Sequence, residues 1–120
     1  MTTQDLRNLA QIIFSKRKVK LYPYEPYKKN INNRWTVIKN IGYPPGTPDM
    51  MGWCINTGIV YACENKTKND FLSSVQIDRL NYMTKENCEC FILEEIDDNT
   101  CILTHWRTNE KETINIKDYK

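Results

Sequence analysis

The sequence has no long apolar run, few glycines and a single histidine. Nothing in its 120 residues approaches the roughly 18 consecutive apolar residues of a membrane span, so we expect a soluble protein. The cysteines number five, and no apolar leader follows Met1, which disfavours a secreted disulfide framework. Reduced thiols in the cytoplasm fit better. With 40% hydrophobic residues and no repeats, the chain predicts one compact domain over residues 1–120.

Net charge is also small. The formal value of +2 comes from 17 basic and 15 acidic residues, which does not by itself indicate a nucleic-acid-binding protein. The distribution is more informative, because basic residues cluster at positions 16–18, 28–29 and 66–68, whereas acidic ones gather at positions 94–98. One pole of the molecule could therefore face phosphates.

Hydrophobic periodicity predicts two helices. The first begins at a cap on Thr2 or Thr3, ends near Lys16 and repeats apolar residues at three- and four-residue steps. The second is expected over about residues 71–86, after a cap at Asn69-Asp70. Its stripe contains one polar member, Gln76, beside Leu72, Leu80 and Met83.

The other segments favour strands and loops. Residues 18–22 are expected to be extended, residues 23–33 to form a loop because of two prolines, and residues 34–39 to form a strand before the breaker at 42–46. Residues 50–55 and 59–66 predict a hairpin around Asn56-Thr57-Gly58. Three further strands are expected near residues 90–94, 101–106 and 110–116. The predicted fold is α/β, in the order αβββαβ plus a C-terminal β hairpin.

Charged residues lie at the ends of the predicted hairpin strands, where a hydrophobic core would disfavour them. Asp49 precedes the first strand, and Glu64 and Lys66 lie near the end of the second, on the face that alternation gives to Ala62. Mg²⁺ takes oxygen ligands and uses one or two protein carboxylates. We therefore predict that Asp49 and Glu64 bind a divalent metal, with the main-chain carbonyl of Asn65 as a third oxygen.

Such a metal site suits phosphodiester hydrolysis, which needs an activated water and neutralisation of charge on the phosphate. Lys66 adds a compact cation on the same face, which can hold the attacking water or stabilise the transition state. It also offsets the repulsion between the two carboxylates.

The pattern Pro48-Asp49 followed by Glu64-Asn65-Lys66 resembles the PD-(D/E)xK signature of restriction-endonuclease-like nucleases. Gly46-Thr47-Pro48-Asp49, with Gln76 in the following helix, resembles more narrowly the small VRR-NUC family of phages and bacteria. The resemblance covers about residues 42–93. It implies a mixed central sheet flanked by helices, and a Gln76 that lies beside the metal and orients Lys66 or the phosphate.

The same resemblance implies an endonuclease that uses Mg²⁺ or Mn²⁺, acts as a homodimer on branched or flapped DNA, and works in the cytoplasm of a bacterium or a phage-infected host. Many relatives carry a Glu in the first helix, where this chain offers only Asp5 as an acid. The middle position of ExK is commonly apolar, but here it is Asn65, which would need buried hydrogen-bond partners. These departures favour an alternative function: a catalytically weakened module that binds nucleic acid or a protein.

Ordinary explanations exist for each candidate. Asp49 could form a turn after Pro48, Glu64 and Lys66 could be charges on a solvated strand edge, and Gln76 could belong to a core network. The cysteines lack the paired spacing of a zinc site. His105 has no nucleophile nearby and is expected to be structural.

Further candidates concern contacts with nucleic acid. Three basic residues are expected to contact the phosphate backbone of the nucleic acid: Lys68, Arg34 and Lys39. Tyr22, Tyr24 and Tyr27 lie among lysines and could either stack bases or pack a loop against the domain.

Overall fold

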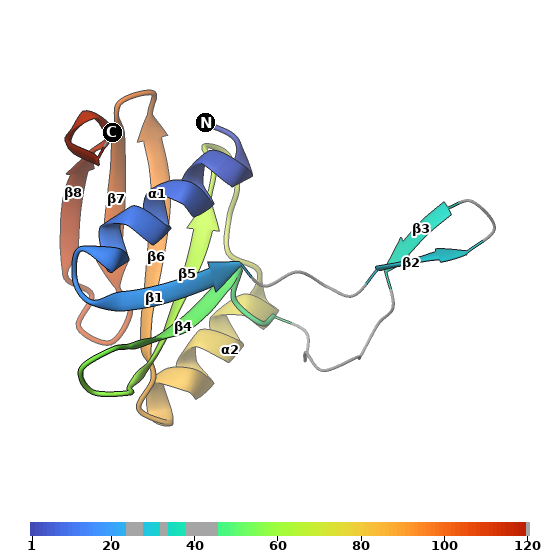
Figure 1. The fold of residues 1–120 in the computed structure, drawn as a ribbon, viewed down its shortest axis with the longest axis horizontal. Coiled ribbons are helices and arrows are strands. Elements are labelled where there is room, and N and C mark those ends of the chain that lie inside the picture. Colours follow the sequence, from blue (N-terminus) through green and yellow to red (C-terminus); the bar gives the residue numbers. More distant parts are fainter. Residues whose placement is uncertain (24–27, 32–33, 38–45, 120) are drawn as a thin grey trace.

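A six-stranded mixed sheet with one α-helix on each face forms the body of the protein (Figure 1). The structure is a computed structural model, and it describes residues 1–23, 28–31, 34–37 and 46–119. The strand order is β1-β4-β5-β6-β7-β8. Every described neighbouring pair in this sheet is antiparallel except β5 and β6, which are parallel and joined through α2. The predicted α/β class, with a mixed sheet flanked by helices, is confirmed.

Helix α1 (Thr3–Ser15) forms as the sequence predicts. Thr2 is its N-cap and accepts a hydrogen bond from the Asp5 amide, while the Asp5 carboxylate accepts one from Thr2. The predicted stripe is buried, together with Phe14. The helix covers one face of the sheet.

Strand β1 (Val19–Pro23) follows as expected and pairs with β4 at the sheet edge. Gly52 makes this pairing feasible, because a Cβ there would lie 1.6 Å from the carbonyl oxygen of Lys20. The loop predicted over residues 23–33 is wrong at β2 (Lys28–Ile31). That strand pairs with β3 (Arg34–Val37) in a separate two-stranded sheet that extends away from the body (Figure 1). The strand predicted at 34–39 is thus confirmed over four residues, and its last two lie outside the described residues.

The predicted hairpin is confirmed as β4 (Met50–Cys54) and β5 (Val60–Lys66). Gly58 has φ +73° in the turn, which is the conformation expected of a glycine there. The predicted alternation along β5 also holds, because Cys63 packs in the core beneath α1 whereas Ala62 packs in the core beneath α2. Glu64 and Lys66 therefore lie on the α2 face.

Helix α2 (Ser74–Lys85) begins later than predicted. The cap predicted at Asn69-Asp70 is wrong: Asn69 has φ +75°, and Ser73 is the N-cap. The apolar stripe is correct, with Leu80 and Met83 buried against the sheet.

The C-terminal strands are confirmed with small shifts in their ends, as β6 (Glu89–Asp97), β7 (Thr100–His105) and β8 (Lys111–Asn115). A short 3₁₀ helix, η1 (Ile116–Tyr119), follows β8 and packs against α1. Within the described ranges, no helix has the length and apolarity needed to span a membrane.

Candidate active site

The site is built where β4 begins and β5 continues beyond it. Met50 is the first residue of β4 and pairs with Cys63, so β5 has no β4 partner at Asn65. Asp49 fills that place: its Oδ2 accepts a hydrogen bond from the Asn65 amide at 3.0 Å. A strand residue directs its N–H and C=O to the same side. The Asn65 carbonyl therefore lies on the side of Asp49, as a third metal ligand requires.

Glu64 is the buried acid of the site. Its side chain is 1% exposed, and its Oε1 accepts a hydrogen bond from Gln76 Nε2 at 3.2 Å. The other oxygen, Oε2, is buried and has no hydrogen-bond donor in the described part of the chain. An ionised buried carboxylate with such an oxygen is costly unless a proton or a cation binds it. This oxygen is therefore open to a cation, which would take the place of the proton.

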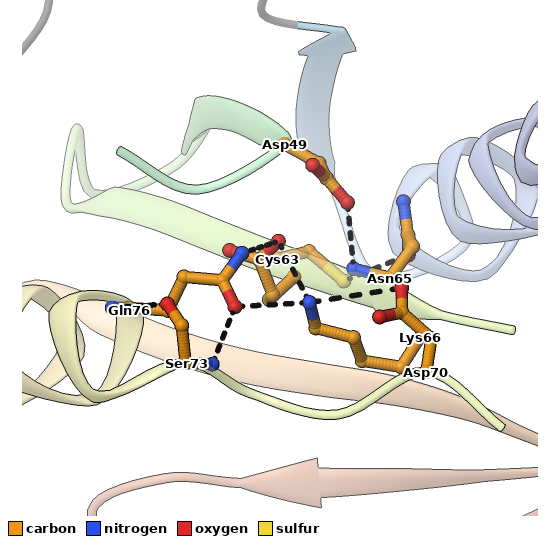
Figure 2. Close-up of polar contacts among 8 residues, drawn as sticks. Asp49, Cys63, Asn65, Lys66, Asp70, Ser73 and Gln76 are labelled. Atoms are coloured by element: carbon orange, nitrogen blue, oxygen red, sulfur yellow. Dashed lines mark hydrogen bonds and ion pairs between the residues drawn. The ribbon is translucent and has the colours of Figure 1, made fainter. Parts of the chain in front are cut away.

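Lys66 lies at the centre of the polar network (Figure 2). Its Nζ donates a hydrogen bond to Gln76 Oε1 at 3.0 Å and lies 4.0 Å from Glu64 Oε1 and 3.8 Å from Asp70 Oδ2. Because the Lys66 side chain is only 8% exposed, these contacts fix the position of its ammonium group. Asp70, which the sequence suggested as a helix cap, instead faces this lysine.

Gln76 joins the two charged groups and also starts the helix. Its side-chain Oε1 accepts hydrogen bonds from Lys66 Nζ and from the backbone N–H of Ser73, the latter at 2.9 Å. The backbone N–H of Gln76 donates to Ser73 Oγ at 3.2 Å. This is a capping box, so the helix end itself fixes the glutamine. Gln76 does belong to a hydrogen-bond network, as its ordinary explanation requires, but its partners in that network are Glu64 and Lys66.

The glycine before Pro48 brings the Asp49 loop against the start of α2. Gly46 has φ +81°, and a Cβ at this position would lie 2.6 Å from the Val75 carbonyl oxygen. Only glycine fits this close approach. Pro48 is fully buried, which holds the loop in place. The Gly-x-Pro-Asp sequence therefore has a structural reason: it places Asp49 next to the helix that carries Gln76.

Burial raises the pKa of Glu64 from its ordinary value near 4.5 to about 8. The negative charge of Asp49 and a hydrogen bond with its carboxyl group raise this pKa further, as does Asp70, whereas Lys66 lowers it. Without a metal, Glu64 therefore holds a proton at neutral pH. A divalent cation would compete with that proton.

These oxygens suit a hard divalent cation. Asp49, Glu64 and the Asn65 carbonyl offer oxygen ligands only, and Mg²⁺ and Mn²⁺ bind such ligands while keeping water molecules. No group of three His, Cys, Asp or Glu side chains that could hold a metal occurs among the described residues. The site thus rests on two carboxylates, which is within the usual number for Mg²⁺.

The buried Asn65 side chain makes only some of the hydrogen bonds that its amide group can form. It is 4% exposed and lies on the α1 face, where its Oδ1 accepts a weak hydrogen bond from Cys63 Sγ at 3.5 Å. Its Nδ2 is buried without a partner in the described residues. This buried amide group lowers the stability of the fold, which an apolar side chain at the same position would not do.

Other predicted residues lie elsewhere. Asp5 is held in the capping box of α1, and its role as a metal ligand stays a prediction. Lys68 is exposed two residues beyond Lys66. The Arg34 side chain and all of Lys39 fall outside what the structure describes. His105 stacks on Phe91, contacts Glu89 and lies 2.9 Å from Thr108 Oγ1, in agreement with a structural role.

Sequence reasoning missed two members of the site. Ser73 caps α2 through Gln76, and Asp70 pairs with Lys66. Both had a sequence signal: Ser73-x-x-Gln76 is a capping-box pattern, and Asp70 is four residues beyond Lys66.

Substituting Gln76 by Leu is expected to slow any reaction at this site about 10- to 100-fold, because the side chain orients one proposed metal ligand, Glu64, and the Lys66 ammonium group. Ser73→Ala is the matched control, since it weakens the same helix cap by about 1 kcal/mol but keeps the contacts of Gln76 with Glu64 and Lys66. Turnover rates and thermal melts of both variants check this. Equal rate losses would show that only the helix cap matters.

The raised pKa of Glu64 also predicts a pH-dependent stability. The folded protein keeps this proton up to about pH 8, whereas the unfolded chain loses it near 4.5. Stability of the metal-free protein should therefore fall as pH rises from about 5 to 8, by up to about 1.4 kcal/mol per pH unit. Thermal melts in EDTA measure this. Glu64→Gln should remove the decline, and an unchanged slope in that variant would refute the assignment.

Comparison with solved structures gives the fold. The chain is similar to Hjc, a Holliday junction resolvase from the archaeal hyperthermophile Archaeoglobus fulgidus, with a TM-score of 0.55, 13% sequence identity, and coverage of 97% of this chain and 90% of that chain. No family model and no curated protein matches the sequence. At this identity the likeness shows the fold alone, which is restriction-endonuclease-like.

Proposed function

We propose that the protein is a divalent-metal-dependent endonuclease in which residues 1–120 form a single nuclease domain. The observation that carries this proposal is the buried network of Glu64, Gln76 and Lys66, beside Asp49 on the adjoining Asn65 amide. The second Glu64 oxygen in this network is buried and has no donor in the described part of the chain. A solvated strand edge would not bury Glu64 and Lys66, which are 1% and 6% exposed. Their burial argues against the ordinary explanation and for a built site.

Each residue has a distinct part in the proposed reaction. Asp49, Glu64 and the Asn65 carbonyl would hold Mg²⁺ or Mn²⁺, which when bound neutralises charge growing on the phosphate and acidifies a water molecule. Lys66 holds its ammonium group on the same face, where it positions the nucleophile and stabilises negative charge on the phosphate. Gln76 keeps Lys66 and Glu64 in register through two hydrogen bonds. Gln76 is therefore a positioning residue.

The substrate we propose is structured DNA with branches, flaps or junctions. The resolvase likeness in fold and the VRR-NUC-like Gly-Thr-Pro-Asp and Gln76 elements both support this class. Lys68, exposed beside the site, and Arg34 and Lys39 would contact the DNA backbone, with a strong dependence on salt. We further propose that the protein acts as a homodimer in the cytoplasm of a bacterium or a phage-infected host, as the resemblance to the small VRR-NUC family implies.

The test is incubation with plasmid, flap, four-way junction and single-stranded DNA in Mg²⁺ or Mn²⁺, with EDTA as the metal-free control. Wild type should cut at least one structured substrate, and Asp49→Ala and Lys66→Ala should not. If wild type cuts nothing, or both variants cut as well as wild type, the enzymatic proposal fails.

A second candidate function is a nuclease-fold module that binds nucleic acid or a protein without efficient cleavage. The specific observation in its favour is the small number of acidic ligands, because Asp5 is engaged in the helix cap. Tight, metal-independent DNA binding without cleavage of any substrate in the panel would support this function instead.

A further inference from the structure

Two exposed aromatic rings lie against each other on the edge of the sheet. Tyr22 on β1 and Trp53 on β4 have ring centroids 5.7 Å apart and an interplanar angle of 34°. They are 48% and 45% exposed, so neither ring is covered by the body of the protein. Lys20, which pairs with Trp53 across the strands and is exposed, adds a positive charge beside the rings.

The rings stand on the same face of the sheet as the candidate active site. Val19 and Leu21 pack beneath α1, so their neighbour Tyr22 points to the other face. On that face Tyr22 is opposite Met51, and Met51 is opposite Ala62, two residues before Glu64. Two strand spacings of about 4.8 Å each, at right angles to a two-residue step of about 6.6 Å along β5, place the Cα atoms of Tyr22 and Glu64 about 12 Å apart. That is a distance of a few nucleotides along one strand.

The α2 helix does not extend over this part of the face. The buried residues beneath α2 lie on β5 and β6: Ala62, Cys90 and Ile92. Met51 is only partly buried at the margin of this cluster, and Val60, opposite Trp53, is 39% exposed. The aromatic pair therefore forms an open platform at the edge of the sheet, beyond the part of this face that α2 covers.

We propose that the Tyr22–Trp53 platform stacks an unpaired nucleobase of the strand whose phosphate enters the site, an inference that rests on the proposed nuclease function. Aromatic faces stack on any base, and the Lys20 charge beside them suits the adjoining phosphates. Bases inside a duplex are already stacked. The platform thus selects DNA with an unpaired stretch, such as a flap or an opened junction arm.

The experiment measures binding without catalysis. Fluorescence anisotropy in EDTA compares a labelled single-stranded oligonucleotide with a second one that has the same phosphates but abasic sites in its central stretch. Wild type should bind the abasic strand about tenfold or more weakly. Trp53→Leu and Tyr22→Leu should lose this preference and Trp53→Phe should keep it, as should Tyr82→Leu, which removes a 57% exposed tyrosine on α2 as the matched control.

Equal binding of both strands by wild type overturns the inference, and because that comparison uses wild type alone, it holds even if a variant fails to fold. A dimer that Trp53→Leu dissociates, seen by light scattering together with equal binding of the two strands, would assign the platform to a second copy instead. Failure of the nuclease proposal looks different: no cleavage in Mg²⁺, with the base preference in EDTA intact.

Discussion

Substituting Asp49 by Asn should abolish cleavage, with a rate at least about a thousandfold below wild type. The change keeps the size of the side chain but removes the charge of one of two carboxylates available to a metal, and loss of metal stabilisation of the transition state is worth several kcal/mol. The same variant should lose most of its affinity for Mn²⁺. Cleavage rates under single turnover and a Mn²⁺ titration followed by electron paramagnetic resonance measure both effects.

Asp78→Asn is the matched control, since Asp78 is exposed on α2 and carries the same carboxylate. It should cleave and bind Mn²⁺ like wild type. If Asp49→Asn also retained wild-type cleavage, Asp49 would be only the residue that occupies the Asn65 amide beyond the start of β4. The metal site would then lie elsewhere.

Substituting Lys66 by Met should lower the cleavage rate about 100- to 1000-fold while the protein still binds Mn²⁺. The ammonium group is a preorganised positive charge in a buried place, and removal of one such group from a transition state costs this much. Methionine keeps the volume of the side chain, so the fold should survive. The expected separation of metal binding from catalysis distinguishes Lys66 from Asp49.

Lys85→Met, in the last turn of α2, removes an exposed lysine as the control and should leave the rate unchanged. A Lys66→Met rate within about threefold of wild type would mean that Lys66 only offsets the charges of Glu64 and Asp70. In that case raising the salt concentration should destabilise wild type more than the variant.

Elements with a clear local pattern could be predicted from the sequence. The Thr2 cap, the α1 stripe and the turn at Gly58 each depend on neighbours within a few residues, and each is confirmed. The same holds for the face shared by Glu64 and Lys66, because strand alternation fixes it once β5 is recognised. The sequence therefore predicts the shared face of these two side chains, on which the candidate site depends.

Strand partners and helix starts were harder to predict because they depend on contacts distant in sequence. The strand at Arg34–Val37 was recognised, but local propensity did not reveal that it pairs with the lysine-rich β2 rather than with the main sheet. Asn69-Asp70 has the residue types of a helix cap, yet Asp70 forms an ion pair with Lys66 and the N-cap of α2 is Ser73. In both places a tertiary contact decided between local alternatives.

The most direct test of the central claim is a crystal structure with Mn²⁺, located by its anomalous scattering. The account predicts one peak within coordination distance of Asp49, Glu64 Oε2 and the Asn65 carbonyl oxygen, with Lys66 and Gln76 still in contact. No peak there at saturating Mn²⁺, or carboxylates too far apart to share the ion, would contradict it.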